Sequence, residues 1–263
     1  FIAVTPSESV NMTACMLATN LGAVTTLARI GNYEYLLPKN KEFFNKLGVD
    51  SLIYPEMLAA KEIVDALKNS WQRVNMSFGG NALVLLGIKI RANAPVANQQ
   101  FQTRFLDHAR FRVVAIKRKN ETIIPKGTDQ IIDGDIVFFI TKNENIEFTR
   151  EQAGKLNRPI KNVMIMGGSR IGVKTIQYLP EKVNVKVLEV DYDKCMQISD
   201  ATKGKLVING DGRDLELLKQ EGIQEMDAFV AVTGNSEANI LACLAAKRFG
   251  VIKTIAEIEN FDY

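Results

Sequence analysis

The sequence predicts an α/β protein in which doubly wound parallel sheets flank a small α+β domain. Segments typical of strands and helices alternate near both ends of the chain, which is the pattern of a parallel sheet covered by helices. From Gln72 to Ile140 the pattern changes to short strands separated by turn residues, which favours an antiparallel sheet. An internal repeat relates the two ends.

Length and composition are those of a globular protein. The chain has 263 residues, of which 46% are apolar and 24% charged, so a disordered or fibrous protein is excluded. The formal charge of +3 is too small to indicate a nucleic-acid partner. Three widely spaced cysteines without a CxxC motif predict reduced thiols in the cytoplasm. The longest apolar run, Ala82 to Ile88, is far shorter than the ~20 residues of a membrane span.

The repeat is the strongest feature of the sequence. Residues 1–35 align without a gap on residues 229–263, and 14 of the 35 positions are identical. Each copy reads as a strand, a polar turn, a helix that ends at Gly22 or Gly250, and a second β-branched strand, which together form a βαβ half-unit. Since the repeat begins inside a strand at Phe1, we expect the chain to be an internal fragment of a tandem protein.

The segments between the copies follow in order. Residues 40–47 predict a short helix, 50–54 a strand and 56–67 a helix that Pro55 opens. Strands are then expected at 72–77, 82–89, 112–117, 122–124 and 136–140, with glycine turns at 79–81 and 133–135. The polar run 142–159 is expected to be a linker.

The last third of the chain alternates strictly between strand and helix. Strands are expected at 160–166, 184–190, 205–208 and from Phe229, and helices at 172–179, from Lys194, and at 215–221. This series predicts a Rossmann-like doubly wound sheet.

A glycine-rich loop follows the first of these strands. It reads Gly167-Gly168-Ser169-Arg170-Ile171-Gly172. In a dinucleotide fingerprint the three glycines serve a tight turn, close approach to the pyrophosphate, and packing of the helix on the strand. Gly167 and Gly172 fill the first and third positions, Ser169 replaces the second, and Asp191 follows as a candidate ribose acid. The alternative interpretation is a glycine turn that binds no ligand, because the Ser169 Cβ would crowd a phosphate.

Two more loops are expected at the same edge of the sheet. Asp211 and Gly212 follow the third strand, on the side of the adenine, and Thr233 to Asn239 follow the fourth, near the ribose or phosphates. Ordinary turn and N-cap use of Asp, Asn and Thr explains both loops equally well.

The order of motifs resembles a known family. The segments MIMGGSRIGVKTIQYL, VLEVDYDKC, VINGDGRDLELLKQEGI and AVTGNSEANILACLAAKRFG resemble the tandem TrkA-type subunits of bacterial potassium uptake systems. GGNALVLLGIKI and IPKGTDQIIDGDIVFFI resemble the small C-terminal domain of that family. The resemblance implies half of a first Rossmann-type domain at 1–69, the small domain at 70–150, and a second Rossmann-type domain at 157–263.

The resemblance also implies the site. Gly167, Gly172 and Asp191 match the phosphate loop and the ribose acid, and Arg170 matches an arginine that some members direct at phosphate. Positions near the ligand are matched by Asp211, Thr233, Glu237 and Asn239. Ser169 departs from the pattern, which bears on affinity or ligand choice. Thr5, Glu8 and Asn11 are taken as the equivalents in the first copy.

The function implied is regulation rather than catalysis. The resemblance implies NAD(H) or ATP/ADP as the ligand, a membrane-embedded potassium transporter as the partner, a homo-oligomer, and a cytoplasmic location on the inner face of the membrane. His108 is the single histidine, and no catalytic triad or metal-binding motif is present in the sequence, so neither catalytic nor metal-binding residues are expected. The alternatives are an NAD(P)-dependent oxidoreductase and a tandem scaffold with a degenerate pocket.

Overall fold

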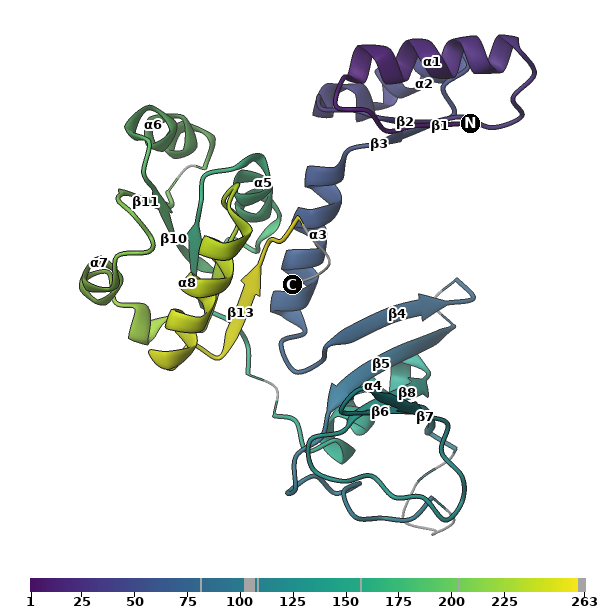
Figure 1. Ribbon diagram of the computed structural model, residues 1–263, viewed down its shortest axis with the longest axis vertical. Coiled ribbons are helices and arrows are strands. Elements are labelled where there is room, and N and C mark those ends of the chain that lie inside the picture. Colours follow the sequence, from purple (N-terminus) through teal and green to yellow (C-terminus); the bar gives the residue numbers. More distant parts are fainter. Residues whose placement is uncertain (81, 102–106, 108, 157, 203, 260–263) are drawn as a thin grey trace. The chain divides into compact units, whose positions relative to one another are not determined.

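The structure is a computed structural model that describes residues 1–80, 82–101, 107, 109–156, 158–202 and 204–259. The chain divides into two compact units. Residues 1–64 and 162–263 form the first unit, and residues 65–161 form the second. The colour bar of Figure 1 identifies the second unit as the blue to teal part of the ribbon.

The last third of the chain forms a five-stranded parallel sheet in the first unit. Its strand order is β11-β10-β9-β12-β13, and every pairing is parallel. The strands are β9 (Asn162–Met166), β10 (Asn184–Glu189), β11 (Leu206–Asn209), β12 (Ala228–Ala231) and β13 (Lys253–Ala256). The strand order reverses beside β9, so the doubly wound topology is confirmed and its crevice lies at the carboxyl ends of β9 and β12.

Helices connect these strands and cover both faces of the sheet. They are α5 (Arg170–Tyr178), α6 (Tyr192–Ala201), α7 (Leu215–Gln220), the 3-10 turn η3 (Ile223–Glu225) and α8 (Ser236–Arg248). Right-handed crossovers place α5 and α6 on one face and α7 and α8 on the other. The core includes Met164, Leu188, Leu218 and Phe229, all fully buried.

Residues 1–53 form a second, three-stranded parallel sheet in the order β1-β2-β3. Its elements are β1 (Ile2–Ala3), α1 (Glu8–Asn20), β2 (Leu27–Arg29), η1 (Tyr33–Leu36), α2 (Pro38–Lys46) and β3 (Ser51–Ile53). Helix α3 (Pro55–Lys68) follows and begins at the proline, as expected. The first repeat copy thus has the same β-α-β order as β12, α8 and β13.

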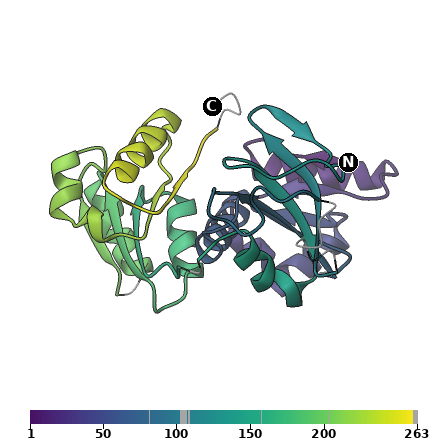
Figure 2. The same ribbon diagram turned by 90° about the horizontal axis from the view of Figure 1, so that it is seen from below.

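The second unit is the small α+β domain, drawn in blue and teal in Figure 2. Its antiparallel sheet has the order β4-β5-β8-β6-β7. The strands are β4 (Val74–Phe78), β5 (Leu83–Lys89), β6 (Phe111–Arg118), β7 (Glu121–Ile123) and β8 (Ile136–Thr141). Leu86, Ile88, Ile116 and Phe139 form the centre of its core.

One expectation for this domain is wrong. The polar run 142–159, expected to be a linker, contains the turn η2 (Asn143–Asn145) and helix α4 (Ile146–Gln152). Ile146 and Phe148 pack on the domain core. Two apolar side chains two residues apart are too few to produce a visible helical period. Within the part of the chain that the structure describes, no helix combines the length and apolarity that crossing a bilayer requires.

Candidate functional site

The turn after β9 requires its first glycine. Gly167 has φ +106°, and a Cβ there would lie 2.8 Å from the carbonyl oxygen of Val232. Its amide donates to the Leu188 carbonyl at 2.9 Å, so the turn is held between β10 and β12. A side chain is excluded both by the backbone conformation and by the neighbouring strand.

The third glycine lets helix α5 approach the strand. A Cβ on Gly172 would lie 2.5 Å from the carbonyl oxygen of Gly167 and 3.4 Å from Val232 Cγ2. The steric reasons for glycine at the first and third positions of the fingerprint are therefore present in this loop.

Ser169 is the N-cap of α5. Its φ is −64°, and its hydroxyl accepts a hydrogen bond from the Gly172 amide at 3.3 Å. The cap satisfies one of the free donors at the helix start and leaves the hydroxyl proton available to a ligand. The amides of Arg170 and Ile171, in the first turn, have no intrahelical acceptor. The start of α5 thus offers donors and the positive end of a helix dipole to an anion.

The carboxylate nearest this loop belongs to Glu189, the last residue of β10. Glu189 Oε2 accepts a hydrogen bond from the Gly168 amide at 2.7 Å, and Oε1 accepts one from the Asp191 amide at 3.0 Å. A carboxylate at a strand end, tied to the glycine loop, is where a ribose acid belongs in a doubly wound sheet.

Asp191 lies two residues further and has another task. Its carboxylate caps α6 by accepting from the Lys194 amide at 3.1 Å, and its side chain is exposed. The sequence reasoning missed Glu189, although a signal existed. Glu189 is 22 residues beyond Gly167 and Asp191 is 24 residues beyond it, so Glu189 fits the expected spacing of about 20 residues better.

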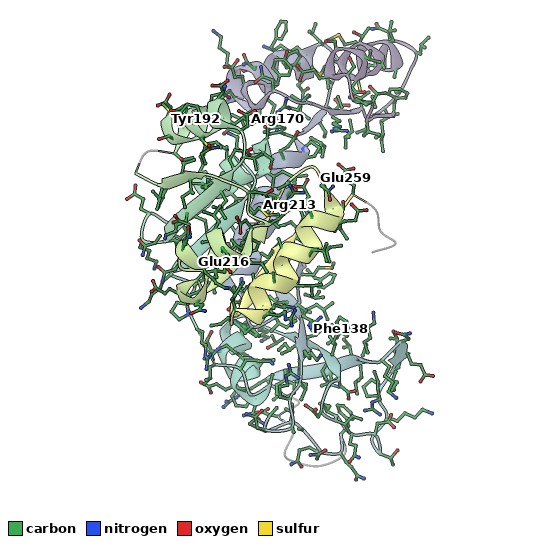
Figure 3. The ribbon with its side chains drawn as sticks, turned by 60° about the vertical axis from the view of Figure 1, so that its left-hand side comes forward. Phe138, Arg170, Tyr192, Arg213, Glu216 and Glu259 are labelled. Carbon is green, nitrogen blue, oxygen red and sulfur yellow. The ribbon has the colours of Figure 1, made fainter. Side chains whose placement is uncertain are left out.

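The loop after β11 borders the glycine loop. Gly212 is buried, and a Cβ there would lie 2.5 Å from Met166 Cγ at the end of β9. The Asp211 carboxylate is held by Arg213, whose Nη2 is 2.6 Å from Oδ2 and whose Nε is 2.9 Å from Oδ1. These hydrogen bonds keep the pKa of Asp211 below its usual value. Arg213 is labelled in Figure 3.

The loop after β12 is organised by one asparagine. Asn239 is fully buried, and its Oδ1 accepts from the Thr233 amide at 3.1 Å and from the Thr233 hydroxyl at 2.6 Å. Its Nδ2 donates to the carbonyls of Thr233 and Glu257 at 2.9 and 3.0 Å. Asn239 therefore fixes the loop rather than facing the crevice. Thr233 is beside Gly167, because the Cβ built on Gly167 would lie 3.0 Å from Thr233 Cγ2.

The first repeat copy carries the same bonds. Asn11 Oδ1 accepts from the amide and hydroxyl of Thr5 at 2.8 and 2.7 Å, and its Nδ2 donates to the carbonyls of Thr5 and Arg29. Glu8, taken as the equivalent of Glu237, instead occupies the place of Ser236. Glu8 accepts from the Gly31 amide, as Ser236 accepts from the Glu259 amide.

Two predicted side chains are directed elsewhere in the structure. Arg170, labelled in Figure 3, is exposed, and its Nη1 lies 3.6 Å from Glu56 Oε1 and 3.5 Å from the Gly31 carbonyl oxygen. Glu237 lies in the first turn of α8 with an exposed side chain.

The site has the composition of a binding crevice. The described residues include no group of three or more His, Cys, Asp or Glu side chains that could hold a metal ion. His108 lies outside the described residues. The loops 167–172, 189–191, 211–212 and 232–239 supply amides and hydroxyls around the end of β9, together with the Glu189 carboxylate that is bonded to the glycine loop, which suits an anion joined to a sugar.

Known proteins share these two domain types. The TrkA-N domain model matches residues 163–263, and the TrkA-C domain model matches residues 85–154. The Trk system potassium uptake protein TrkA of Halomonas elongata is 32% identical over 265 residues, and that of Vibrio alginolyticus is 31% identical over 266 residues. Each alignment covers 100% of this chain but 58% of the relative, so the chain spans less than two thirds of these proteins.

Solved structures share the fold. The GsuK RCK domain superposes with a TM-score of 0.61 at 13% identity, covering 97% of this chain and 58% of that chain. The GsuK channel bound to NAD superposes with a TM-score of 0.58 at 14% identity, covering 97% of this chain and 48% of the channel chain. Both domain matches agree with the order of elements in the structure, and the chain carries a TrkA-C domain followed by a TrkA-N domain, in an order shared with the relatives named TrkA.

Proposed function

We propose that this chain is part of a nucleotide-binding regulatory subunit that gates a membrane-embedded potassium uptake transporter from the cytoplasmic side. The observation that supports it most is the loop between β9 and α5, where free helix amides lie beside a carboxylate that is bonded to the glycine loop. The names of the relatives, potassium uptake proteins, give the process to which such a site would respond.

The ligand proposed is an adenine nucleotide, NAD(H) or ATP/ADP, whose ribose has unsubstituted 2′- and 3′-hydroxyls. Its phosphates would bind the amides of Arg170 and Ile171 and the Ser169 hydroxyl, at the start of α5. Glu189 would accept hydrogen bonds from the ribose 2′- and 3′-hydroxyls. A 2′-phosphate would meet this carboxylate as a like charge, so NADP(H) would be rejected. The GsuK structure bound to NAD contains such a ligand on a similar fold.

Binding would act by biasing the geometry of the protein. A ligand changes the balance between two arrangements only through its different affinity for them, and coupling between sites is typically 1–3 kcal/mol. Nucleotide at the glycine loop would favour one arrangement of the tandem units, which the transporter would sense.

The test is calorimetric titration of the full-length protein with NADH, NADPH, ATP and ADP. Glu189→Gln is expected to weaken NADH binding about tenfold, because charged hydrogen bonds contribute about 1.5–3 kcal/mol, and to reduce the preference for NADH over NADPH. Asp193→Asn, an exposed carboxylate on the first turn of α6, is the control and should bind normally. Absence of binding by every nucleotide would refute the proposal, and steady consumption of NADH with an acceptor would favour an oxidoreductase.

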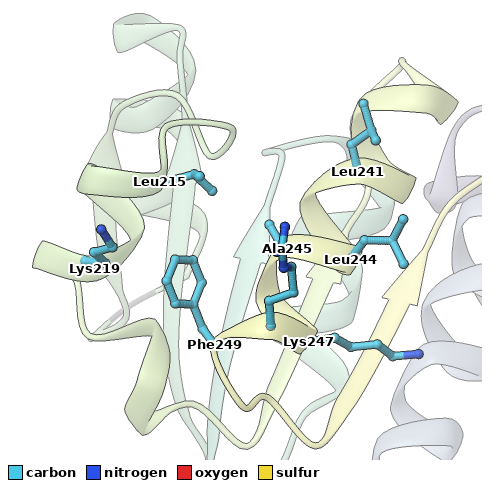
Figure 4. Close-up of a pocket in the computed structure, with 8 residues that line it drawn as sticks. Leu215, Lys219, Leu241, Leu244, Ala245, Lys247 and Phe249 are labelled. Atoms are coloured by element: carbon cyan, nitrogen blue, oxygen red, sulfur yellow. The ribbon is translucent and has the colours of Figure 1, made fainter.

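We infer that the protein is a homo-oligomer that uses an apolar groove between α7 and α8. The groove has a volume of about 800 Å³ and is lined by Leu215, Leu241, Leu244 and Phe249 together with the stems of basic side chains. Figure 4 shows these side chains along the two helices. The corresponding helix of the first copy, α1, likewise exposes Leu17, and Leu21 and Val24 just beyond the helix are exposed as well. Exposed apolar side chains gathered on one side of a helix suit an interaction between copies of the protein.

A further inference from the structure

Four cationic side chains of the small domain come from segments that meet at one end of its sheet. Arg73 precedes β4, Lys89 ends β5, Arg91 begins the following loop, and Lys155 follows α4. Since β4 and β5 are antiparallel, with Val74 opposite Gly87, the start of β4 and the end of β5 share one end of the hairpin.

Close backbone contacts bring the end of α4 to the same place. Gly154 has φ +67°, and a Cβ there would lie 2.8 Å from Ala94 Cα. The Val96 amide donates to the Gln152 carbonyl at 3.1 Å. The loop that begins at Arg91 is therefore fixed against the residue that precedes Lys155.

Lys155 is held by the end of its helix. Its amide donates to the Arg150 carbonyl at 3.0 Å across Gly154, as in a Schellman motif. The Arg150 guanidinium in turn donates to the Lys155 carbonyl and is paired with Glu147 at 2.6 Å. Glu147 thus neutralises the Arg150 charge, and the Arg150 guanidinium fixes the backbone of Lys155 through its carbonyl oxygen.

The charged side chains that act on the Lys155 ammonium group are all cations. Burial of the ammonium group lowers the pKa of Lys155, and Arg91, Arg73 and Lys89 lower it further. None of these four side chains has a hydrogen bond or ion pair with another residue that the structure describes. The dipole at the end of α4 stabilises one cation there, but it does not account for the other three.

We propose that the basic cluster of Arg73, Lys89, Arg91 and Lys155 is a binding site for a small anion that carries several phosphate charges. The two guanidinium groups suit phosphate oxygens as planar donors, and the two ammonium groups act as point charges. Half-burial of Lys155 suits a small ligand that displaces water from around it. All four residues belong to the second unit, with Lys89 and Arg91 inside the TrkA-C match and Arg73 and Lys155 just outside it, whereas the nucleotide crevice beside β9 belongs to the first unit.

The test measures the reactivity of individual lysines in the full chain. Trace acetylation with acetic anhydride, followed by peptide mass spectrometry, is carried out with and without inorganic pyrophosphate at constant ionic strength. A bound anion stabilises the protonated ammonium group and so reduces the fraction of free amine, which is the form that reacts. Acetylation of Lys155 is therefore expected to fall about fivefold. Lys117, an exposed lysine of β6 in the same domain, is the internal control and should change little.

Substitutions make the outcome specific to the site. In the Arg73→Gln/Arg91→Gln double variant, pyrophosphate is expected to protect Lys155 no longer, while Lys117→Gln preserves the protection. Circular dichroism confirms that each variant is folded. Equal protection of Lys155 and Lys117 would mean diffuse screening and would overturn the proposal. So would protection by phosphatidylglycerol vesicles with none by pyrophosphate, because the ligand would then be a lipid surface.

Discussion

Two glycines near the crevice differ sharply in what surrounds them. A Cβ on Gly172 meets a backbone carbonyl at 2.5 Å, whereas a Cβ on Gly234, in the loop after β12, meets nothing within 4 Å. We expect Gly172→Ala to destabilise the protein by about 1–3 kcal/mol, because the helix must move away from the strand, and to reduce nucleotide binding. Gly234→Ala should change neither. Urea unfolding and calorimetry measure both effects, and equal stability of the two variants would contradict this prediction.

The buried amide of Asn239 provides a second contrast. Asn239→Ala leaves the Thr233 amide and the Glu257 carbonyl without their partner, so we expect a loss of about 2 kcal/mol in the free energy of unfolding. Asn45→Ala, at an exposed position of α2, should change it by less than about 0.5 kcal/mol. Denaturant unfolding provides the measurement. A loss at Asn239 no larger than at Asn45 would mean that the buried bonds contribute nothing.

At this scale the sequence predicts the glycines better than the polar residues. Gly167 and Gly172 follow from spacing, because a tight turn and a close helix leave no alternative to glycine. Asp191 and Glu189 are both acids within reach of the expected position, and only the three-dimensional structure shows which one caps a helix and which one bonds to Gly168. Likewise, nothing in the sequence distinguishes a buried asparagine from one in a ligand site.

Among the elements, α8 is apolar on two faces, one buried and one exposed. One face packs Ala242, Cys243 and Ala246 into the core, and the other exposes Leu241 and Leu244 beside the groove. The parallel strands were predictable because a continuous apolar run buried on both sides has few alternatives. Helix α4 was not predictable, because its polar sequence gives no helical period and its apolar packing on the domain core comes from two side chains, Ile146 and Phe148.

The proposed oligomer is tested by placing a charge on the exposed face of α8. Leu244→Glu is expected to weaken self-association at least about tenfold, since ~1.4 kcal/mol or more is lost when a charge enters an apolar interface. Met196→Glu on α6 is the matched control, because both side chains are 53% exposed in the same domain. Light scattering over a concentration series gives the masses. A monomeric parent protein, or equal masses for the two variants, would exclude this interface.

For the molecule as a whole, the buried cysteines are expected to lower the free energy of unfolding as the pH rises into the alkaline range. All three are buried, and burial raises the pKa of each thiol, that of Cys243 to about 11. Between pH 9 and 11 the unfolded chain loses the Cys243 proton while the folded chain retains it. The folded state is therefore destabilised as the pH rises, by up to ~1.4 kcal/mol per pH unit from this residue. Below about pH 9 the contribution is complete and constant.

The comparison of the parent protein with Cys243→Ala isolates this effect. We expect the free energy of unfolding of the parent to fall more steeply between pH 9 and 11 than that of the variant, with parallel curves below pH 9. Urea titrations at a series of pH values measure both curves. Parallel curves up to pH 11 would show that the folded thiol ionises as readily as the unfolded one.

The paired bonds of Thr5 with Asn11 and of Thr233 with Asn239 have a practical consequence. One chain holds two versions of the same loop scaffold, one beside the glycine-rich turn at Gly167 and the other in the three-stranded sheet. The same substitution at Asn11 and at Asn239 therefore gives two measurements of the free energy of unfolding that the loop bonds contribute. A larger loss at Asn239 than at Asn11 would measure the additional contribution of the neighbouring crevice, so the first copy serves as an internal reference for the second.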